Sequence, residues 1–96
     1  MEGYLKKWTN VIYRWKPRYF RLEQGVLKYS KYRFTQSRDK ILLTKCQILV
    51  TPKDKLRFVI RFSDPKKKSV QLRAHSLADK IKWVDALRTA QINELQ

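Results

Sequence analysis

The sequence predicts a mainly β fold, in which seven antiparallel strands form a partly open barrel or sandwich capped by one C-terminal α-helix. Two observations support this prediction. From residue 3 to about residue 73, short segments with alternating apolar residues are separated by turn sequences. From residue 76 to about residue 94 the apolar spacing becomes helical, and no glycine or proline interrupts residues 76–96. A chain of 96 residues is expected to form a single domain.

Seven segments are candidate strands because each has alternating apolar residues or a short run of β-branched and aromatic residues. They cover residues 3–8, 18–22, 26–29, 41–43, 47–50, 58–62 and 70–72. The sequence Glu23-Gln24-Gly25 predicts a tight turn between the second and third strands. An antiparallel sheet that curls into a barrel leaves one end to be covered, and a single helix can cover it.

The last segment begins at Ser76, a helix-capping residue, and Asp79 follows three positions later as in a capping box. Its apolar stripe is expected to comprise Leu77, Ile81, Val84, Leu87 and Gln91, widened by Trp83 and Ala90. From residue 77 onward three cations balance three carboxylates. The helix is therefore not expected to bind anions, which argues against a basic helix in a DNA groove or on a lipid surface.

The chain carries 23 Lys and Arg residues against 8 Asp and Glu, a formal net charge of +15, and this excess lies within residues 1–76. Such an imbalance increases self-repulsion in the folded state and indicates a polyanionic partner. Three classes of partner fit: an anionic membrane face, a nucleic acid or an acidic protein. No segment is apolar and long enough for a transmembrane helix, so any membrane contact is expected to be peripheral.

Residues that could carry catalysis or hold a metal are sparse. Cys46 is the single cysteine; it is expected to be a small buried hydrophobic residue, and its lack of a disulfide partner fits a reducing, cytoplasmic compartment. His75 is the single histidine, so no set of metal ligands is expected. Neither a Gly-rich phosphate loop nor a nucleophile–base pair is present. We therefore predict a protein that is not an enzyme and needs no cofactor.

Alternation along the first three strands places polar side chains at one end of the sheet. If the leucines and the phenylalanine of these strands face the core, one polar residue on each strand shares that face. Antiparallel strand direction brings these residues to a common end, where the next connection also opens. The set comprises Lys7, Arg18 and Tyr29, with Arg38 and Lys40 nearby. Such a cup suits a phosphorylated sugar because Arg grips phosphate through two hydrogen bonds, although solvated rim residues are the alternative.

The connection between the first two predicted strands holds Val11, Ile12 and Tyr13 in a row. Loops are usually polar, and exposed apolar patches often mark contact sites. We expect an exposed apolar tip that wedges between lipid head groups; the alternative is a loop that folds back and buries these side chains. Trp15, which precedes Pro17, is expected to pack inward.

These motifs resemble those of a pleckstrin homology domain, and the resemblance covers nearly the whole chain. The runs Gly3-Tyr4-Leu5-Lys6-Lys7-Trp8-Thr9-Asn10 and Trp15-Lys16-Pro17-Arg18-Tyr19-Phe20-Arg21-Leu22 are similar to those of one subgroup. That subgroup occurs in oxysterol-binding proteins, the ceramide transfer protein and the four-phosphate adaptor proteins. The resemblance implies binding of phosphatidylinositol 4-phosphate, often together with a small Arf-type GTPase, on Golgi membranes.

By motif position, the resemblance implies specific roles for the residues of the cup and of the first connection. Head-group contacts would come from Lys7, Arg18, Tyr29 and Arg38, with Lys40 beside them. The membrane wedge would comprise Trp8, Asn10, Val11, Ile12 and Tyr13. The chain departs from the subgroup at Arg14, where glycine is usual, and its basic connection between strands three and four could broaden the choice of lipid.

Two other functions remain open from the sequence alone. A protein-interaction module for a small GTPase or an acidic peptide is compatible with lipid binding. A single-strand nucleic-acid binder would place aromatics on an open sheet face between cations, and exposed aromatics are expected here only in two connections, so no nucleic acid is expected. The run Lys66-Lys67-Lys68 is either a solvated turn or a second contact to an anionic surface. We expect a monomer that forms the N-terminal part of a larger lipid-transfer or adaptor protein.

Overall fold

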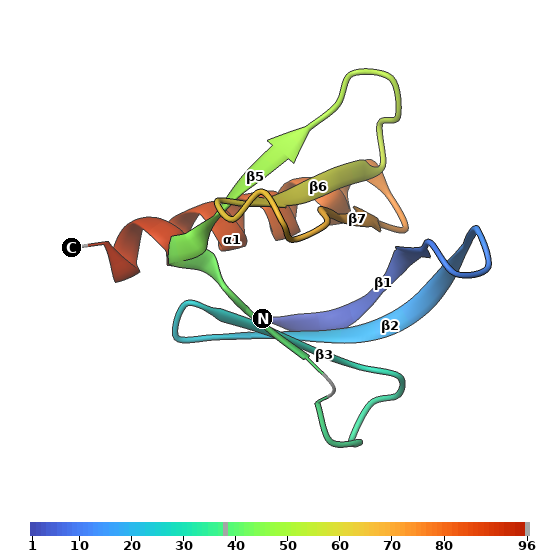
Figure 1. Cartoon of the computed structure of the whole chain (residues 1–96), viewed down its shortest axis with the longest axis horizontal. Coiled ribbons are helices and arrows are strands. Elements are labelled where there is room, and N and C mark those ends of the chain that lie inside the picture. The colour runs from blue at the N-terminus through green and yellow to red at the C-terminus, as the bar shows by residue number, and fades with distance from the viewer. Residues whose placement is uncertain (38, 96) are drawn as a thin grey trace.

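The computed structural model describes residues 1–37 and 39–95, and within them it contains seven strands and one long helix (Figure 1). A short 3₁₀ helix separates the fourth and fifth strands. The elements are β1 (Glu2–Thr9), β2 (Arg14–Glu23), β3 (Val26–Ser30), β4 (Asp39–Leu42), η1 (Leu43–Lys45), β5 (Cys46–Val50), β6 (Arg57–Phe62), β7 (Val70–Arg73) and α1 (Leu77–Glu94).

The strands form one antiparallel sheet in the order β4-β3-β2-β1-β7-β6-β5. Two layers result, because the sheet folds over at β1, which pairs along its length with β2 and only through Lys6 and Lys7 with β7 (Figure 1). Among the described residues the edge strands β4 and β5 do not pair with each other, so the barrel stays partly open. The predicted fold class is confirmed.

The core lies between the two layers and is completed by α1. Its largest fully buried side chains include Leu5, Phe20, Phe58 and Trp83. Ser76 caps the helix as predicted, since its Oγ accepts a hydrogen bond of 3.1 Å from the Asp79 amide. Burial also raises the pKa of the Cys46 thiol, which is the small buried hydrophobic residue that the sequence predicts.

The buried stripe of α1 differs from the predicted one. Leu77 and Ile81 are exposed, whereas Lys80 is buried beside Trp83 on the helix face that packs inward. The helix packs mainly against η1, β5 and β6 through Trp83, Val84 and Leu87, and this orientation leaves Leu77 and Ile81 on its solvent side. Gln91 faces the sheet as predicted but contributes hydrogen bonds, since its side-chain amide donates to the backbone carbonyls of Leu43 in η1 and of Cys46 at the start of β5.

The second strand is longer than predicted and changes the position of one tryptophan. Strand β2 begins at Arg14, so Trp15 lies on a strand and pairs with Trp8. Because Arg18 and Phe20 face the interior, alternation puts Trp15 on the outer face, where it packs edge-on against Trp8 with ring centroids 5.5 Å apart. The expectation that Trp15 packs inward is therefore wrong.

Candidate functional site

The hairpin tip, residues 10–13, projects from one end of the sheet and lies far from the C-terminus (Figure 1). Thr9 closes it by donating a hydrogen bond of 2.9 Å from its hydroxyl to the Arg14 carbonyl. Its apolar side chains are turned to solvent: Val11 is 91% exposed, Tyr13 76% and Ile12 44%. The predicted exposed tip is present, and the alternative of a loop that buries these residues is excluded.

A hollow of about 410 Å³ lies directly behind the hairpin tip. We call it the basic pocket, and its lining comprises Lys7 and Thr9 of β1, Arg18 of β2, Tyr29 of β3 and Asp39 of β4. The register explains this convergence, because Arg18 lies opposite Leu5 and Tyr29 lies opposite Phe20 on the core-facing side. The structure thus brings together three of the five residues expected to contact a head group.

The cations of the basic pocket are held close together at an electrostatic cost. The Lys7 ammonium lies 5.6 Å from the centroid of the Tyr29 ring. Burial and the neighbouring Arg18 guanidinium lower the pKa of Lys7, while the Asp39 carboxylate opposes this shift. A bound anion would relieve the repulsion between the two cations, since an opposite charge nearby favours their protonated forms.

Asp39 is a member of the basic pocket that the sequence did not predict. Its Oδ2 accepts a hydrogen bond of 3.0 Å from the Tyr29 hydroxyl. The signal was present in the alternation of β4, since Ile41 faces the core and Asp39 lies two positions earlier. The predicted strand began at Ile41 and so omitted the residue that places a carboxylate among the cations.

Neither of the two remaining predicted head-group residues belongs to the described lining of the basic pocket. Arg38 lies outside the described residues. Lys40 pairs with Lys28, one step along from the Tyr29–Asp39 pair, and it does not line the basic pocket. It lines a side pocket of about 290 Å³ that shares Tyr29 and Asp39 with the basic pocket.

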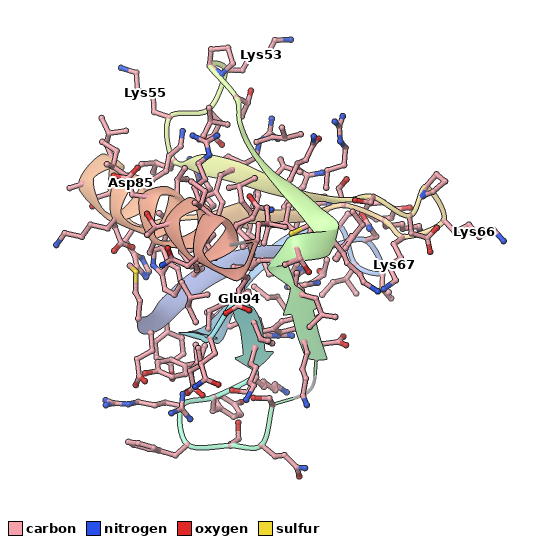
Figure 2. The ribbon with its side chains drawn as sticks, turned by 90° about the vertical axis from the view of Figure 1, so that its left-hand side faces the viewer. Lys53, Lys55, Lys66, Lys67, Asp85 and Glu94 are labelled. Atoms are coloured by element: carbon pink, nitrogen blue, oxygen red, sulfur yellow. The ribbon has the colours of Figure 1, made fainter. Side chains whose placement is uncertain are left out.

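Two lysines of the run at residues 66–68 lie in the side pocket, next to the basic pocket. Lys67 and Lys68 line it, and the Lys67 ammonium lies 5.5 Å from the centroid of the Phe62 ring. Lys66 instead extends away from the molecule (Figure 2). Two of the three lysines therefore border the hollow beside the basic pocket, whereas Lys66 matches the solvated turn.

Fold and site together define a small binding module with a cationic hollow beside an apolar hairpin. A family model for the PH domain matches residues 1–91, so the chain belongs to the PH domain family. Domains of this family are generally non-catalytic modules. Within the described residues no group of His, Cys, Asp and Glu could hold a metal ion, and no helix is long and apolar enough to cross a membrane.

Individual relatives and solved structures agree with this assignment. The chain is 38% identical to Pleckstrin homology domain-containing family A member 8 of Danio rerio over 94 residues, which cover 95% of this chain and 17% of that protein. It therefore spans less than a fifth of that relative's length.

Among solved structures, the PH domain of human oxysterol binding protein-related protein 11 has a TM-score of 0.83 at 25% identity. The match covers 98% of this chain and 81% of that structure's chain. The Slm1-PH domain in complex with inositol-4-phosphate has a TM-score of 0.80 at 16% identity, with coverage of 95% and 94%. The family is thus established, while the subgroup implied by the sequence motifs stays a prediction.

Proposed function

We propose that this domain binds the head group of phosphatidylinositol 4-phosphate in the basic pocket while the hairpin tip inserts into the same membrane. Lys7 and Arg18 would hold the phosphate, Tyr29 would contact the head group beside them, and Arg38 and Lys40 would add charge at the rim. Trp8 and residues 10–13 would form the wedge. The observation that carries this proposal is the basic pocket itself, whose lining residue Thr9 also closes the exposed tip.

The Asp39 carboxylate favours a head group that carries few phosphates. Two cations and one carboxylate line the described part of the basic pocket, which leaves one positive charge in excess. A carboxylate only accepts hydrogen bonds, so it pairs well with a sugar hydroxyl and repels a second phosphate. An inositol ring with one phosphate and free hydroxyls matches this set, and the solved complex of the Slm1-PH domain with inositol-4-phosphate makes that head group the first to test.

The finer elements of the proposal rest on the sequence motifs. A membrane that carries phosphatidylinositol 4-phosphate would place the domain peripherally on the Golgi. Recognition of an Arf-type GTPase is compatible with this placement, but no feature of the described residues favours one surface for it. Nonspecific binding to nucleic acid or to any anionic surface is the alternative that the experiment must exclude.

Sedimentation with vesicles that each contain a single phosphoinositide tests the proposal. Lys7→Ala should weaken binding to the 4-phosphate lipid by roughly 10- to 100-fold, the effect of losing a hydrogen bond to a charged group, about 1.5–3 kcal/mol. Lys6→Ala is the matched control, because Lys6 is the next residue of β1, is exposed and lines neither pocket. It should lose only general attraction to the membrane, about 1 kcal/mol.

Circular dichroism of both variants establishes that they remain folded. Equal losses in the two variants, or equal binding of the wild-type domain to every anionic vesicle and to RNA, would refute a specific pocket and favour attraction by charge alone.

A further inference from the structure

The open edge of β2 carries a second hollow that the proposed function does not use. Strand β2 starts at Arg14, but β3 pairs with it only from Tyr19 onward. Where β3 stops, a notch of about 570 Å³ opens between the unpaired part of β2 and the start of the β3–β4 connection. We call this hollow the notch; it is larger than the basic pocket.

The notch is lined by four cations, which are Arg14, Lys16, Arg18 and Lys31. None of the described residues that line it is acidic. Nor does any of the four lie in an ion pair with a carboxylate of the described residues. Four cations without a counter-charge around one hollow repel one another, so an anion in the notch would be stabilised by all of them.

Neutral groups of the notch also suit a phosphate. The Tyr4 hydroxyl accepts a hydrogen bond of 3.1 Å from the Arg33 amide, and among the described residues none accepts its hydrogen, which stays available to a ligand. The Tyr32 carbonyl accepts hydrogen bonds from the Ser30 and Thr35 hydroxyls. These bonds fix the turn that carries Lys31, whose ammonium lies 5.7 Å from the centroid of the Tyr32 ring. The notch therefore has both charge and an ordered wall.

The position of the notch indicates where its ligand comes from. Arg18 lines both the notch and the basic pocket, so the two hollows flank the same strand. Arg14 adjoins the hairpin tip and accepts at its carbonyl the hydrogen bond that closes this tip. A membrane that receives the tip would thus face both hollows at once.

A peptide strand is the less suitable occupant of this edge. Pro17 lines the notch and has no amide hydrogen, so the edge of β2 cannot offer a continuous ladder to an added strand. Cations along an edge strand also discourage pairing.

We infer that the notch binds a second anionic lipid head group, a phosphate carried by a neighbouring lipid of the same bilayer. This inference rests on the proposed function for the membrane's position. The domain would then bind two lipids together, one in the basic pocket and one at the open edge of β2, and its binding would respond to the anionic lipid that surrounds the phosphoinositide.

Nuclear magnetic resonance titration tests the site directly. The domain is first saturated with inositol 4-phosphate, and short-chain phosphatidic acid is then added below its micelle concentration. We expect saturable shifts at the Lys31 and Tyr32 amides and at the Trp15 indole. Lys31→Ala should weaken this second event about fivefold, the loss of one cation near an anionic head group, and leave the first event unchanged.

The matched control is Lys53→Ala, an exposed lysine that points away from the molecule on the β5–β6 connection (Figure 2). Shifts that grow linearly without saturation, or an equal loss in the two variants, would overturn the inference. An acidic peptide that saturates the same amides and displaces the phosphatidic acid would overturn it in favour of a protein ligand.

Binding to vesicles shows whether the ligand of the notch is a lipid in a bilayer or a free phosphate. Adding phosphatidic acid to phosphatidylcholine vesicles that contain phosphatidylinositol 4-phosphate should strengthen wild-type binding several-fold, and Lys31→Ala should lose most of this gain. Unchanged binding would show that the notch does not read the bilayer. If the proposed function itself fails, inositol 4-phosphate will not shift Lys7 or Tyr29, whereas the shifts of Lys31 and Tyr32 can still be scored; the two failures are therefore distinguishable.

Discussion

Replacing Val11 with aspartate should detach the domain from membranes while leaving its head-group pocket intact. Val11 is 91% exposed at the hairpin tip, so little of its side chain stabilises the folded protein. Ile12 is a poorer target because it is only 44% exposed, so less of its side chain is available to a membrane. Val11 also lies outside the basic pocket, so the substitution tests insertion alone.

The magnitude follows from the area that the tip can bury. Burying a whole valine side chain contributes about 1.5–3 kcal/mol, and nearly all of this side chain is available. The Val11→Asp variant loses this contribution. Repulsion between its new carboxylate and an anionic leaflet costs about a further 1 kcal/mol. A total of about 2.5–4 kcal/mol corresponds to a loss of membrane affinity of roughly 70- to 900-fold.

Two assays on one variant separate insertion from recognition. Surface pressure of a monolayer containing phosphatidylinositol 4-phosphate measures insertion, and isothermal titration with soluble inositol 4-phosphate measures the pocket. Leu95→Asp is the matched control, since Leu95 is an exposed leucine that directly follows α1. The C-terminus lies at the opposite end of the molecule from the hairpin tip (Figure 1). The reasoning is refuted if Val11→Asp inserts as well as this control, or if it weakens soluble head-group binding to the same extent.

Three further outcomes are expected. Asp39→Asn should raise affinity for bisphosphorylated inositol more than for inositol 4-phosphate, because it removes the charge that repels a second phosphate; isothermal titration measures the ratio. Head-group binding should weaken in alkaline solution as Lys7 loses its proton, and it should do so at a lower pH than for an ordinary lysine because its pKa is lowered. Lys7→Arg should extend binding to higher pH, since arginine keeps its charge. Gly25→Ala should lower the free energy of unfolding by about 1–2 kcal/mol in urea, because Gly25 has φ of 74° and an added Cβ would meet the Glu94 side chain at 2.1 Å.

Each of these predictions has a result that contradicts it. An unchanged ratio in Asp39→Asn would show that this carboxylate does not select the head group. An alkaline limb that is identical in the wild-type domain and in Lys7→Arg would assign the titration to another group. Gly25→Asn offers a comparison for the turn, since asparagine tolerates positive φ better than alanine, and this variant should be less destabilised than Gly25→Ala. A Gly25→Ala variant that unfolds at the same urea concentration as the wild-type domain would contradict the argument from the turn.

Much of the fold and part of the site were predictable because their rules are local. Alternation of side chains and the antiparallel direction of consecutive strands sufficed to bring Lys7, Arg18 and Tyr29 to one end. The same alternation, continued back past Pro17 to Arg14, places Trp15 on the outer face. The predicted strand began only at Arg18, and the indole avoids full exposure by packing against Trp8 instead of entering the core. Pro17 is tolerated in β2 because β3 pairs with this strand only from Tyr19 onward. No strand lies beside this edge at Pro17, so the absence of an amide hydrogen breaks no hydrogen bond to β3.

The sequence by itself determined the strand and helix periods, the cap at Ser76, the exposed apolar tip and the confinement of excess charge to the sheet. The tertiary structure decided which charges meet: it added Asp39 to the cations, drew Lys67 and Lys68 to the side pocket, and opened the notch where β3 ends before β2. The physical reason is that alternation and capping act over a few residues. The side pocket that the β6–β7 connection shares with β4, and the point at which β3 leaves β2, depend on packing between segments that are separate in the chain.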